Sequence, residues 1–308
     1  MTSNKPVRAL LASLLFIACG LSVSQAALAA SATLDKIKSS GAVTMGVRES
    51  SIPMSYTTGD NRFDGYHVEI CRMILADIKD KLGMKTIQIN YQPVTSQNRV
   101  PLVQNGTVDI ECGTTTNNVA RAKDVNFAYT LYVEEVRIAV KANSGITSIA
   151  QLSGKKVATT TGTTSVKLLR QHEKANGVNF EEVYGKDHAD SFLLLESGRA
   201  DAFVMDGSIL AGNIANSKNP KDYKIVGEVL STEPIAIMTR KDDPEFLAAV
   251  DAAIAKIVAS GAMPKLWNKW FLSPIPPKNI VVGLELSPAT KNAWANLNNK
   301  PAEDYLKK

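Results

Sequence analysis

Two arginines between residues 94 and 121 are the side chains best suited to hold carboxylates. Arg99 and Arg121 each stand near an expected helix start, and each follows a run of hydroxyl and amide residues. A helix start offers unpaired backbone N–H groups and a partial positive charge. A guanidinium matches a carboxylate through two parallel hydrogen bonds. Two such sites on one chain predict a ligand that carries two carboxylates.

The hydrophobic pattern predicts strands that alternate with helices, which is typical of βαβ units and a mainly parallel sheet. The helix expected over 66–82 repeats isoleucine or leucine at four-residue steps, and Gly83 follows as its stop. The other strands are expected at 42–47, 86–92, 108–111, 135–141, 156–160, 181–184, 202–205 and 235–240. The other helices are expected near Arg99 and Arg121 and at 162–176, 190–197, 208–216, 244–260 and 264–271.

The composition is that of an ordinary globular protein, with 44% hydrophobic and 21% charged residues. A length of 308 residues predicts about two domains. There is no run of basic residues, and the aromatic content of 6% gives no platform for stacking bases. We therefore do not expect nucleic acid as a partner.

The first 29 residues have the pattern of a cleaved secretory signal. Lys5 and Arg8 precede an apolar run over 9–23, and Ala27-Leu28-Ala29 provides the small residues of a cleavage site. Cleavage after Ala29 would lower the net charge from +5 to +3. Lipid attachment at Cys19 is the alternative, but the residue three positions before it is Phe16 rather than the usual leucine.

Two cysteines, Cys71 and Cys112, would remain after cleavage. In an oxidising compartment they could form a disulfide. Cys71 lies on the apolar stripe of an expected helix and Cys112 at an expected strand end, so two buried thiols are the alternative. The three histidines lack metal-ligand spacing with either cysteine, and we expect neither a metal nor a cofactor.

Five stretches give the chain, over essentially all of its length after residue 29, a strong family resemblance. It resembles the periplasmic amino-acid-binding proteins of ATP-driven importers, the family 3 solute-binding proteins, and most of all their members for acidic amino acids. The stretches are V-R-E-S-S-I-P at 47–53, T-S-Q-N-R at 95–99, E-C-G-T-T-T-N-N-V-A-R at 111–121, G-K-D-H-A-D-S-F at 185–192 with E-S-G-R-A-D-A-F-V-M-D at 196–206, and S-P-I-P-P-K-N at 273–279.

The resemblance implies an α/β, two-lobed periplasmic binding protein fold of type II. In this fold each lobe has a central sheet flanked by helices, two hinge strands join the lobes, and the ligand lies between them. By the same resemblance, lobe one is 33–132 plus 235–308, lobe two is 137–230, and the hinges are about 133–136 and 231–234.

Five residues resemble those that hold the α-carboxylate and α-ammonium groups of an amino acid in this family. Arg121 would clamp the α-carboxylate, with Thr164 closing on it from lobe two. Thr116 would cap the helix at Arg121 and touch both groups, and Thr114 would offer its backbone carbonyl to the ammonium. Asp206 would pair with the ammonium, and its alternative role is to cap the next helix.

Four further residues match positions that surround the distal carboxylate in the receptors for acidic amino acids. They are Arg48, Ser96, Arg99 and His188. A buried carboxylate needs paired charges and hydrogen bonds, and a neutral amide in its place would leave the guanidiniums unpaired. Asp187 could orient the ring of His188.

The expected function is a monomeric periplasmic receptor for L-glutamate or L-aspartate. Hinge closure would bury the ligand, and the closed form would dock on an inner-membrane ABC permease. The ATPase would be a separate protein, because the chain has no G-x-x-x-x-G-K-[ST] motif. The alternatives are a receptor for glutamine or asparagine, a sensing module, and a dehydratase of cyclic carboxylates with Glu111 or His188 as its acid.

Overall fold

The computed structural model describes residues 1–2 and 31–305. The expected signal peptide, its cleavage site after Ala29 and the alternative lipid site at Cys19 lie outside the described residues.

The first of two five-stranded sheets has the order β5-β1-β6-β13-β7. Its β1 pairs in parallel with β5 and β6, whereas β13 runs antiparallel to β6 and β7. Its strands are β1 (Ala42–Val47), β5 (Gln88–Pro93), β6 (Ile110–Glu111), β7 (Val125–Phe127) and β13 (Met238–Arg240). A small antiparallel sheet near it consists of β2 (Ser50–Ser51), β3 (Ser55–Gly59) and β4 (Arg62–Asp64).

The second five-stranded sheet has the order β10-β9-β11-β8-β12. Here β9 is parallel to β10 and β11, and β8 is antiparallel to β11 and β12. Its strands are β8 (Tyr132–Lys141), β9 (Lys156–Thr160), β10 (Glu181–Gly185), β11 (Ala202–Asp206) and β12 (Tyr223–Ile235).

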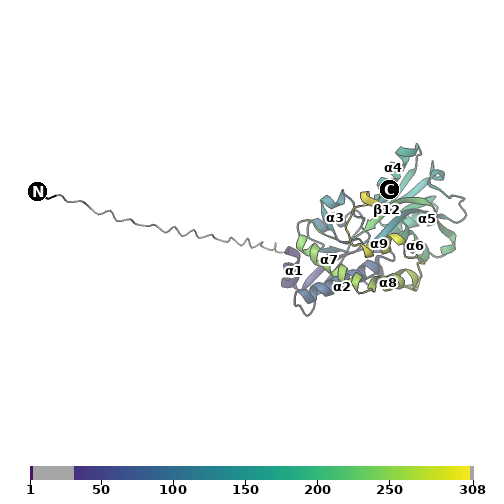
Figure 1. Cartoon of the computed structure of the whole chain (residues 1–308). Coiled ribbons are helices and arrows are strands. Elements are labelled where there is room, and N and C mark those ends of the chain that lie inside the picture. The colour runs from purple at the N-terminus through teal and green to yellow at the C-terminus, as the bar shows by residue number, and fades with distance from the viewer. Residues whose placement is uncertain (3–30, 306–308) are drawn as a thin grey trace.

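The helices fall into two groups, one around each sheet (Figure 1). With the first sheet are α1 (Ala32–Ser40), α2 (Tyr66–Lys81), α3 (Arg99–Gln104), α7 (Pro244–Ala259) and α8 (Ala262–Trp267), which continues as a π-helix over Asn268–Leu272. With the second sheet are α4 (Thr164–Asn176), α5 (His188–Glu196) and α6 (Gly207–Asn216). Two C-terminal helices follow, α9 (Pro288–Ala295) and α10 (Ala302–Tyr305).

The four-residue repeat of α2 explains its position against the first sheet. Ile70, Ile74 and Ile78 are fully buried and share one core with residues of β1 and α7. The helix ends at Lys81, and Gly83 takes a positive φ of 67° that favours glycine. The second sheet has separate apolar clusters, one of them containing Val136, Val157 and Leu169.

The two sheets are linked by the pair of antiparallel strands β8 and β12. The chain leaves β7 of the first sheet into β8 of the second, and it returns through β12 to β13. Pairing runs from Tyr132 opposite Ile235 to Lys141 opposite Tyr223, with an irregularity between Val226 and Ser231. The ends of β8 and β12 nearest the first sheet therefore form a two-stranded link between the sheets.

Most expected elements are present, but β12 was not predicted over most of its length. The strand expected at 235–240 is divided, because β12 ends at Ile235 and β13 begins at Met238. Gly227 and Pro234 both weaken the local strand signal in β12. Pairing with β8 over Tyr223–Val226 and Ser231–Ile235 overrides that weak signal.

No single helix among the described residues is long and apolar enough to cross a membrane. One pair, Pro244–Ala259 with Ala262–Leu272, passes the same test by length and composition only, and it is bent by 84°.

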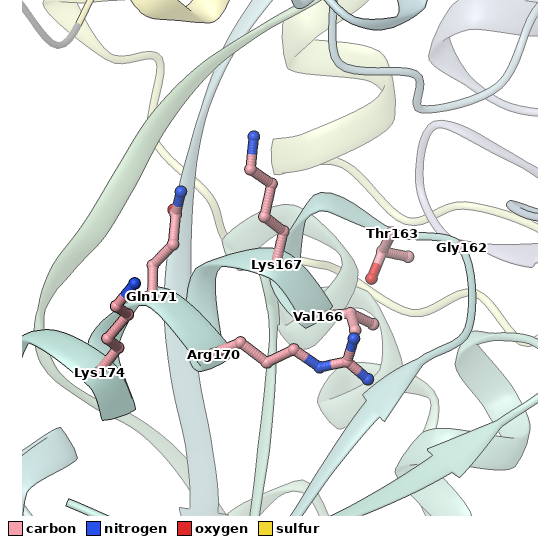
Figure 2. Close-up of a pocket in the computed structure, with 7 residues that line it drawn as sticks. All are labelled: Gly162, Thr163, Val166, Lys167, Arg170, Gln171 and Lys174. Atoms are coloured by element: carbon pink, nitrogen blue, oxygen red, sulfur yellow. The ribbon is translucent and has the colours of Figure 1, made fainter. Parts of the chain in front are cut away.

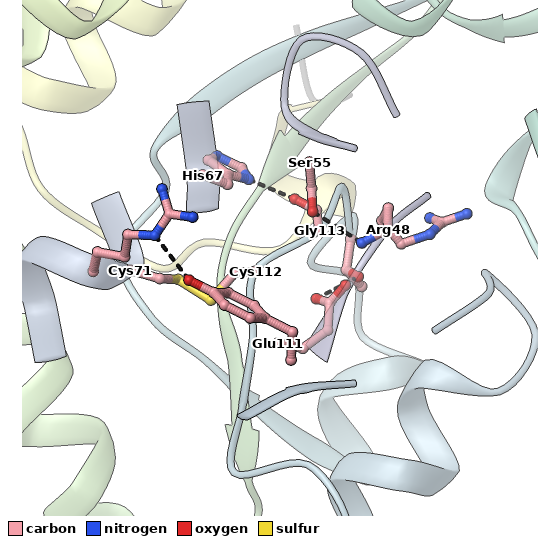
Figure 3. Close-up of a disulfide and its surroundings, with 10 residues drawn as sticks. Arg48, Ser55, His67, Cys71, Glu111, Cys112 and Gly113 are labelled. Carbon is pink, nitrogen blue, oxygen red and sulfur yellow. Dashed lines mark hydrogen bonds between the residues drawn. A yellow bond between two sulfur atoms is a disulfide. The ribbon is translucent and has the colours of Figure 1, made fainter. Parts of the chain in front are cut away.

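The two cysteines form a disulfide, which decides between the alternatives that the sequence left open (Figure 3). Cys71 lies on α2 and Cys112 directly follows β6, and both side chains are fully buried. The bond closes a loop with a sequence separation of 41 residues, and that loop contains Ser96 and Arg99.

The segment after Pro277 packs on the first core. Ile280, Val282, Leu284 and Leu286 lie against that core, and Trp294 donates from its indole nitrogen to the carbonyl of Leu131 at 2.8 Å. The hydrogen bond from Trp294 therefore holds this segment against Leu131, the residue directly before β8.

We expect the double substitution Cys71→Ala with Cys112→Ala to lower the free energy of unfolding by about 3–4 kcal/mol. A disulfide that closes a loop of this length lowers the conformational entropy of the unfolded chain. This raises the free energy of the unfolded state by about the same 3–4 kcal/mol. Urea unfolding followed by circular dichroism measures it. Dithiothreitol should destabilise the wild type and leave the double variant unchanged, and an equal effect on both would contradict the prediction.

Candidate functional site

Seven of the nine expected ligand-binding residues line one small enclosed space between the two sheets. The space has no room for a water molecule, so a ligand can enter only if the elements on its two sides move apart. The lining residues are Ser96, Arg99, Thr114, Thr116, Thr163, Thr164, His188, Met205 and Asp206. Arg48 and Arg121, the other two expected residues, lie next to this space and interact electrostatically with Arg99.

Arg99 begins α3, as expected, and only 2% of it is exposed. Within the described chain, its Nε and Nη1 have no hydrogen-bond partner. Burial, followed by repulsion from Arg121 and Arg48, lowers the pKa of Arg99 to about 9. A buried guanidinium with free donors and like-charged neighbours is stabilised by an anion in the adjoining space.

Arg48 follows β1 and is fully buried. Its Nη2 donates to Asp187, while Nε and Nη1 have no partner among the described residues. The Asp187 carboxylate also accepts from the Ser50 hydroxyl at 2.8 Å. Burial, the largest single effect, raises the pKa of Asp187, but the positive charge of Arg48, the interaction with His188 and the hydrogen bond from Ser50 together hold that pKa below its usual value.

The expectation that Asp187 orients the ring of His188 is wrong, because no hydrogen bond joins the two among the described residues and the Asp187 carboxylate accepts from Arg48 and Ser50. The ring of His188 instead contacts the hydroxyl of Thr160 through Nδ1 at 3.0 Å. His188 is the first residue of α5 and is 1% exposed. Burial and then the charge of Arg48 lower its pKa to about 3, so the imidazole is neutral near pH 7.

Asp206 ends β11 and occupies the N-cap position of α6, but it does not act as a cap. Among the described residues, no capping bond involves its carboxylate, and its Oδ1 has no partner. The backbone N–H of Ser208 is directed at Glu134 instead, at 3.3 Å. Burial, followed by repulsion from Glu134 and Glu233, raises the pKa of Asp206 well above its usual value. A cation beside Asp206 would relieve this cost.

The segment around Arg121 differs from the expected helix. Arg121 begins a 3₁₀ turn of only three residues, Arg121–Lys123, so Thr116 cannot cap a helix there. Thr116 forms an isolated bridge with Ile235, and the Asn117 N–H donates to the Pro234 carbonyl at 2.9 Å. These bonds keep residues 116–117 extended.

The Arg121 guanidinium spans the two sides of the enclosed space. It donates from Nη1 to the Thr116 carbonyl at 3.0 Å and from Nη2 to the Gly162 carbonyl, near α4, at 3.2 Å. Burial lowers the pKa of Arg121, and the negative charges of Glu233 and Asp206 oppose that effect. Arg121 is therefore a fixed positive charge at the junction of the two sides.

Sequence reasoning missed three residues at the site: Thr163 and Met205, which line the space, and Glu233, which contacts two of its threonines. One carboxylate oxygen of Glu233 accepts from the Thr116 hydroxyl at 2.6 Å and from the Thr164 hydroxyl at 2.8 Å. The residue lies near the end of β12, the strand whose sequence pattern was too weak to be recognised. The resemblance placed a hinge over 231–234 but assigned no contact to this carboxylate.

Glu111 is the last residue of β6, as expected, and it is fully buried (Figure 3). It accepts from the Thr115 hydroxyl at 2.9 Å. Burial raises its pKa, and the charges of Arg99 and Arg48 work against that rise. An added Cβ on Gly113 would lie 2.2 Å from Oε1 of Glu111, so a larger residue there would displace this carboxylate.

A larger depression of about 480 Å³ lies along the outer side of α4 (Figure 2). It has the exposed side chains of Lys167, Arg170 and Lys174, which do not converge on one point in Figure 2. It therefore lacks the buried, unpaired polar groups that mark the enclosed space. Nor do the described residues contain a group of three or more His, Cys, Asp or Glu side chains arranged to hold a metal ion.

Two α/β units joined by a pair of strands, with a buried polar site between them, define the class of two-lobed binding proteins. A family model agrees with this class: residues 43–273 match the bacterial extracellular solute-binding proteins, family 3. The chain belongs to this family. It is therefore a binding protein and not an enzyme, and its close relatives are import proteins.

Two curated relatives cover most of the chain. The glutamate/aspartate import solute-binding protein of Escherichia coli is 43% identical over 97% of this chain and 99% of its own length. The L-glutamate/L-aspartate-binding protein of Pseudomonas aeruginosa is 41% identical over 88% of this chain and 90% of its own length.

A solved structure confirms the fold expected from the resemblance. The solute receptor for L-cysteine of Neisseria gonorrhoeae superposes with a TM-score of 0.71 at 26% identity, covering 84% of this chain and 98% of that one. The two-lobed type II fold that the sequence predicted is thereby confirmed.

We expect His188 to make the protein sensitive to acid. Its folded pKa of about 3 is below the unfolded value of 6.5, so the unfolded chain takes up a proton first as the pH falls. The stability that this residue contributes is complete above pH 6.5 and is lost towards pH 3, by about 1.4 kcal/mol per pH unit.

The measurement is urea unfolding of the wild type and of His188→Gln between pH 4 and 7. The variant should lose less stability than the wild type as the pH is lowered. Parallel curves would contradict the assignment of a buried, neutral imidazole.

Proposed function

We propose that the protein is a periplasmic receptor that captures L-glutamate and L-aspartate and delivers them to an ABC permease. The observation that carries this proposal is the set of buried, unpaired guanidinium nitrogens of Arg48 and Arg99 beside one enclosed space. The names of the relatives in Escherichia coli and Pseudomonas aeruginosa support the same ligands.

In this proposal, Arg48, Arg99, Ser96 and His188 hold the distal carboxylate. The free donors of Arg48 and Arg99, together with the unpartnered hydroxyl of Ser96, match the acceptors of a carboxylate. The neutral ring of His188 joins them as a donor through Nε2 when Nδ1 accepts the Thr160 hydroxyl proton. The amide of glutamine would bring no negative charge to Arg99 and to the free donors of Arg48, which argues against the glutamine and asparagine alternatives.

The remaining five residues hold the groups that all amino acids share. Arg121 pairs with the α-carboxylate, and the hydroxyls of Thr116 and Thr164 donate to it from opposite sides of the space. The unpaired Oδ1 of Asp206 receives the α-ammonium, assisted by the backbone carbonyl of Thr114. Because Asp206 lies among other carboxylates, the incoming cation offsets an existing repulsion.

Binding requires that the two lobes open and close. We assign lobe one to 33–132 plus 235–308, lobe two to 137–230, and the hinges to about 133–136 and 231–234. The hinge residues belong to the paired ends of β8 and β12, and the space between the lobes has no room for a ligand to enter without movement. The ligand contacts both lobes only in the closed form, so it shifts the population towards closure.

After closure, the receptor passes its ligand to an inner-membrane permease whose ATPase is a separate protein. It acts as a monomer and reaches the periplasm through a signal peptide that is cleaved after Ala29. The disulfide between Cys71 and Cys112 supports an oxidising compartment.

We expect tight one-to-one binding of L-glutamate and L-aspartate by the purified, ligand-stripped protein. L-Glutamine should bind at least about a hundredfold more weakly, because it leaves the guanidiniums unpaired. Isothermal titration calorimetry with the three ligands measures this. Tight binding of glutamine, or no binding of any of the three, would overturn the proposed function.

Arg99→Met should distinguish the proposed site of the distal carboxylate from the proposed site of the α-carboxylate. The variant retains side-chain volume but loses the donors for the distal carboxylate, so we expect glutamate affinity to fall by about a hundredfold and glutamine affinity by less than about tenfold. Arg121→Met is the matched comparison, because it should weaken both ligands. Equal losses for both ligands in Arg99→Met would show that Arg99 serves the shared α-carboxylate.

A further inference from the structure

Glu111 is a buried carboxylate near the guanidiniums of the site, and the proposed function does not use it. It is fully buried, and its Oε1 has no hydrogen-bond partner among the described residues. An added Cβ on Gly113 would lie 2.2 Å from this oxygen and 3.0 Å from Cγ of Arg48. The Glu111 carboxylate and the Arg48 side chain therefore lie close together (Figure 3).

The two guanidiniums that the proposed function assigns to the distal carboxylate differ in their counter-charges. Arg48 forms an ion pair with Asp187, whereas Arg99 has no ion pair in the described chain. Burial and two like charges lower the pKa of Arg99, and Glu111 is the first of the carboxylates that oppose this fall. The protein therefore supplies a negative charge of its own to Arg99.

We propose that Glu111 is a specificity-determining residue, whose ionised carboxylate limits how strongly the distal site prefers a carboxylate to an amide. This inference rests on the proposed function, which puts a ligand carboxylate at Arg99 and Arg48. The free donors of the two arginines favour any acceptor. The charge of Glu111 repels a carboxylate there and leaves a neutral amide almost unaffected.

Removal of the Glu111 charge leaves the guanidinium donors in place and makes the distal site more positive. It should strengthen the binding of L-glutamate and leave the binding of L-glutamine nearly unchanged. At an effective dielectric constant of about 20, unit charges a few ångströms apart interact strongly enough for about a tenfold change in affinity. A residue that only supported the packing would, on substitution, weaken both ligands together.

The same repulsion makes the selectivity depend on pH. Burial raises the pKa of Glu111, while the charges of Arg99 and Arg48 and the hydrogen bond from Thr115 oppose that rise. A ligand carboxylate nearby would raise the pKa of Glu111 further, because it adds a negative charge. Protonation of Glu111 removes the repulsion, so the preference for glutamate over glutamine should rise as the pH falls.

The other groups around Glu111 do not account for such a pH dependence. From the neighbouring elements it is faced by three cations and one apolar side chain, which are Arg48 after β1, Arg99 on α3, Arg121 in the 3₁₀ turn and Met238 on β13. Burial lowers the pKa of His67 on α2 to about 4, so this ring stays neutral above pH 5. His188 and Asp206 line the space in every variant compared below, so their titration affects all of the proteins alike.

Isothermal titration calorimetry with L-glutamate and L-glutamine compares the wild type with three variants. Glu111→Gln retains the size of the side chain and removes its charge, whereas Glu111→Asp retains the charge. Asp124→Asn is the control, because it removes an exposed carboxylate near Arg121. At about pH 7.5 we expect the ratio of glutamate to glutamine affinity to rise about tenfold in Glu111→Gln and to stay within about threefold of the wild type in the other two.

The same titrations at about pH 8 and about pH 5.5 provide the second readout. The ratio should rise in the wild type as the pH falls, and it should change less in Glu111→Gln, which has no carboxylate to protonate at this position.

Thr115→Val tests the same carboxylate without replacing it, and it also serves if Glu111→Gln fails to fold. The Thr115 hydroxyl donates to Glu111 at 2.9 Å and favours its charged form. Loss of this bond should raise the pKa of Glu111, so the ratio should begin to rise at a higher pH than in the wild type.

An unchanged ratio in Glu111→Gln, or an equal loss of affinity for both ligands, would overturn the role of Glu111 and leave the proposed function standing. A wild type that binds neither ligand would overturn the proposed function, and this inference with it.

Discussion

The burial of positive charge between the two lobes is the constraint on which the site depends. Arg48 and Arg99 are buried, with guanidinium nitrogens that have no partner in the described chain, and Arg121 is held beside them. A protein tolerates this arrangement only where nearby anions offset the loss of hydration. Three carboxylates each offset part of this loss of hydration from a different side of the site. They belong to Asp187, Glu111 and Glu233.

The fold provides this site because two α/β units meet across a link of only two strands. The guanidiniums come from the residue after β1, the start of α3 and the 3₁₀ turn at Arg121, and the starts of α4 and α5 supply Thr164 and His188. Each unit has its own apolar core, so the units can move relative to each other without loss of that packing. Polar contacts, such as those of Arg121 and Glu233, also join the two units.

The sequence predicted the elements with strong periodicity and the residues with a family match. The bounds of β1 and β9 agree with the expectation, as does the apolar stripe of α2, because burial on one face leaves a clear pattern. The nine expected binding residues lie in or next to one space, although their contacts to a ligand stay a prediction.

What sequence reasoning missed depended on contacts between distant segments. Strand β12 forms because β8 pairs with it, and residues 116–117 stay extended because Pro234 and Ile235 hold them. The partners of Asp187 and Glu233 are likewise far away in the sequence, at Arg48 and at Thr116 and Thr164. No local pattern records such pairings, so neither carboxylate could be assigned correctly in advance.

The disulfide between Cys71 and Cys112 has a consequence for how the protein withstands proteases. The covalent ring that it closes encloses the chain that carries Ser96 and Arg99. If a protease cuts one peptide bond between Arg72 and Glu111, the two pieces stay joined through the sulfur atoms. The segment that carries Ser96 and Arg99 is thus retained after a single cut, so the protein gains tolerance to proteolytic nicking in this region.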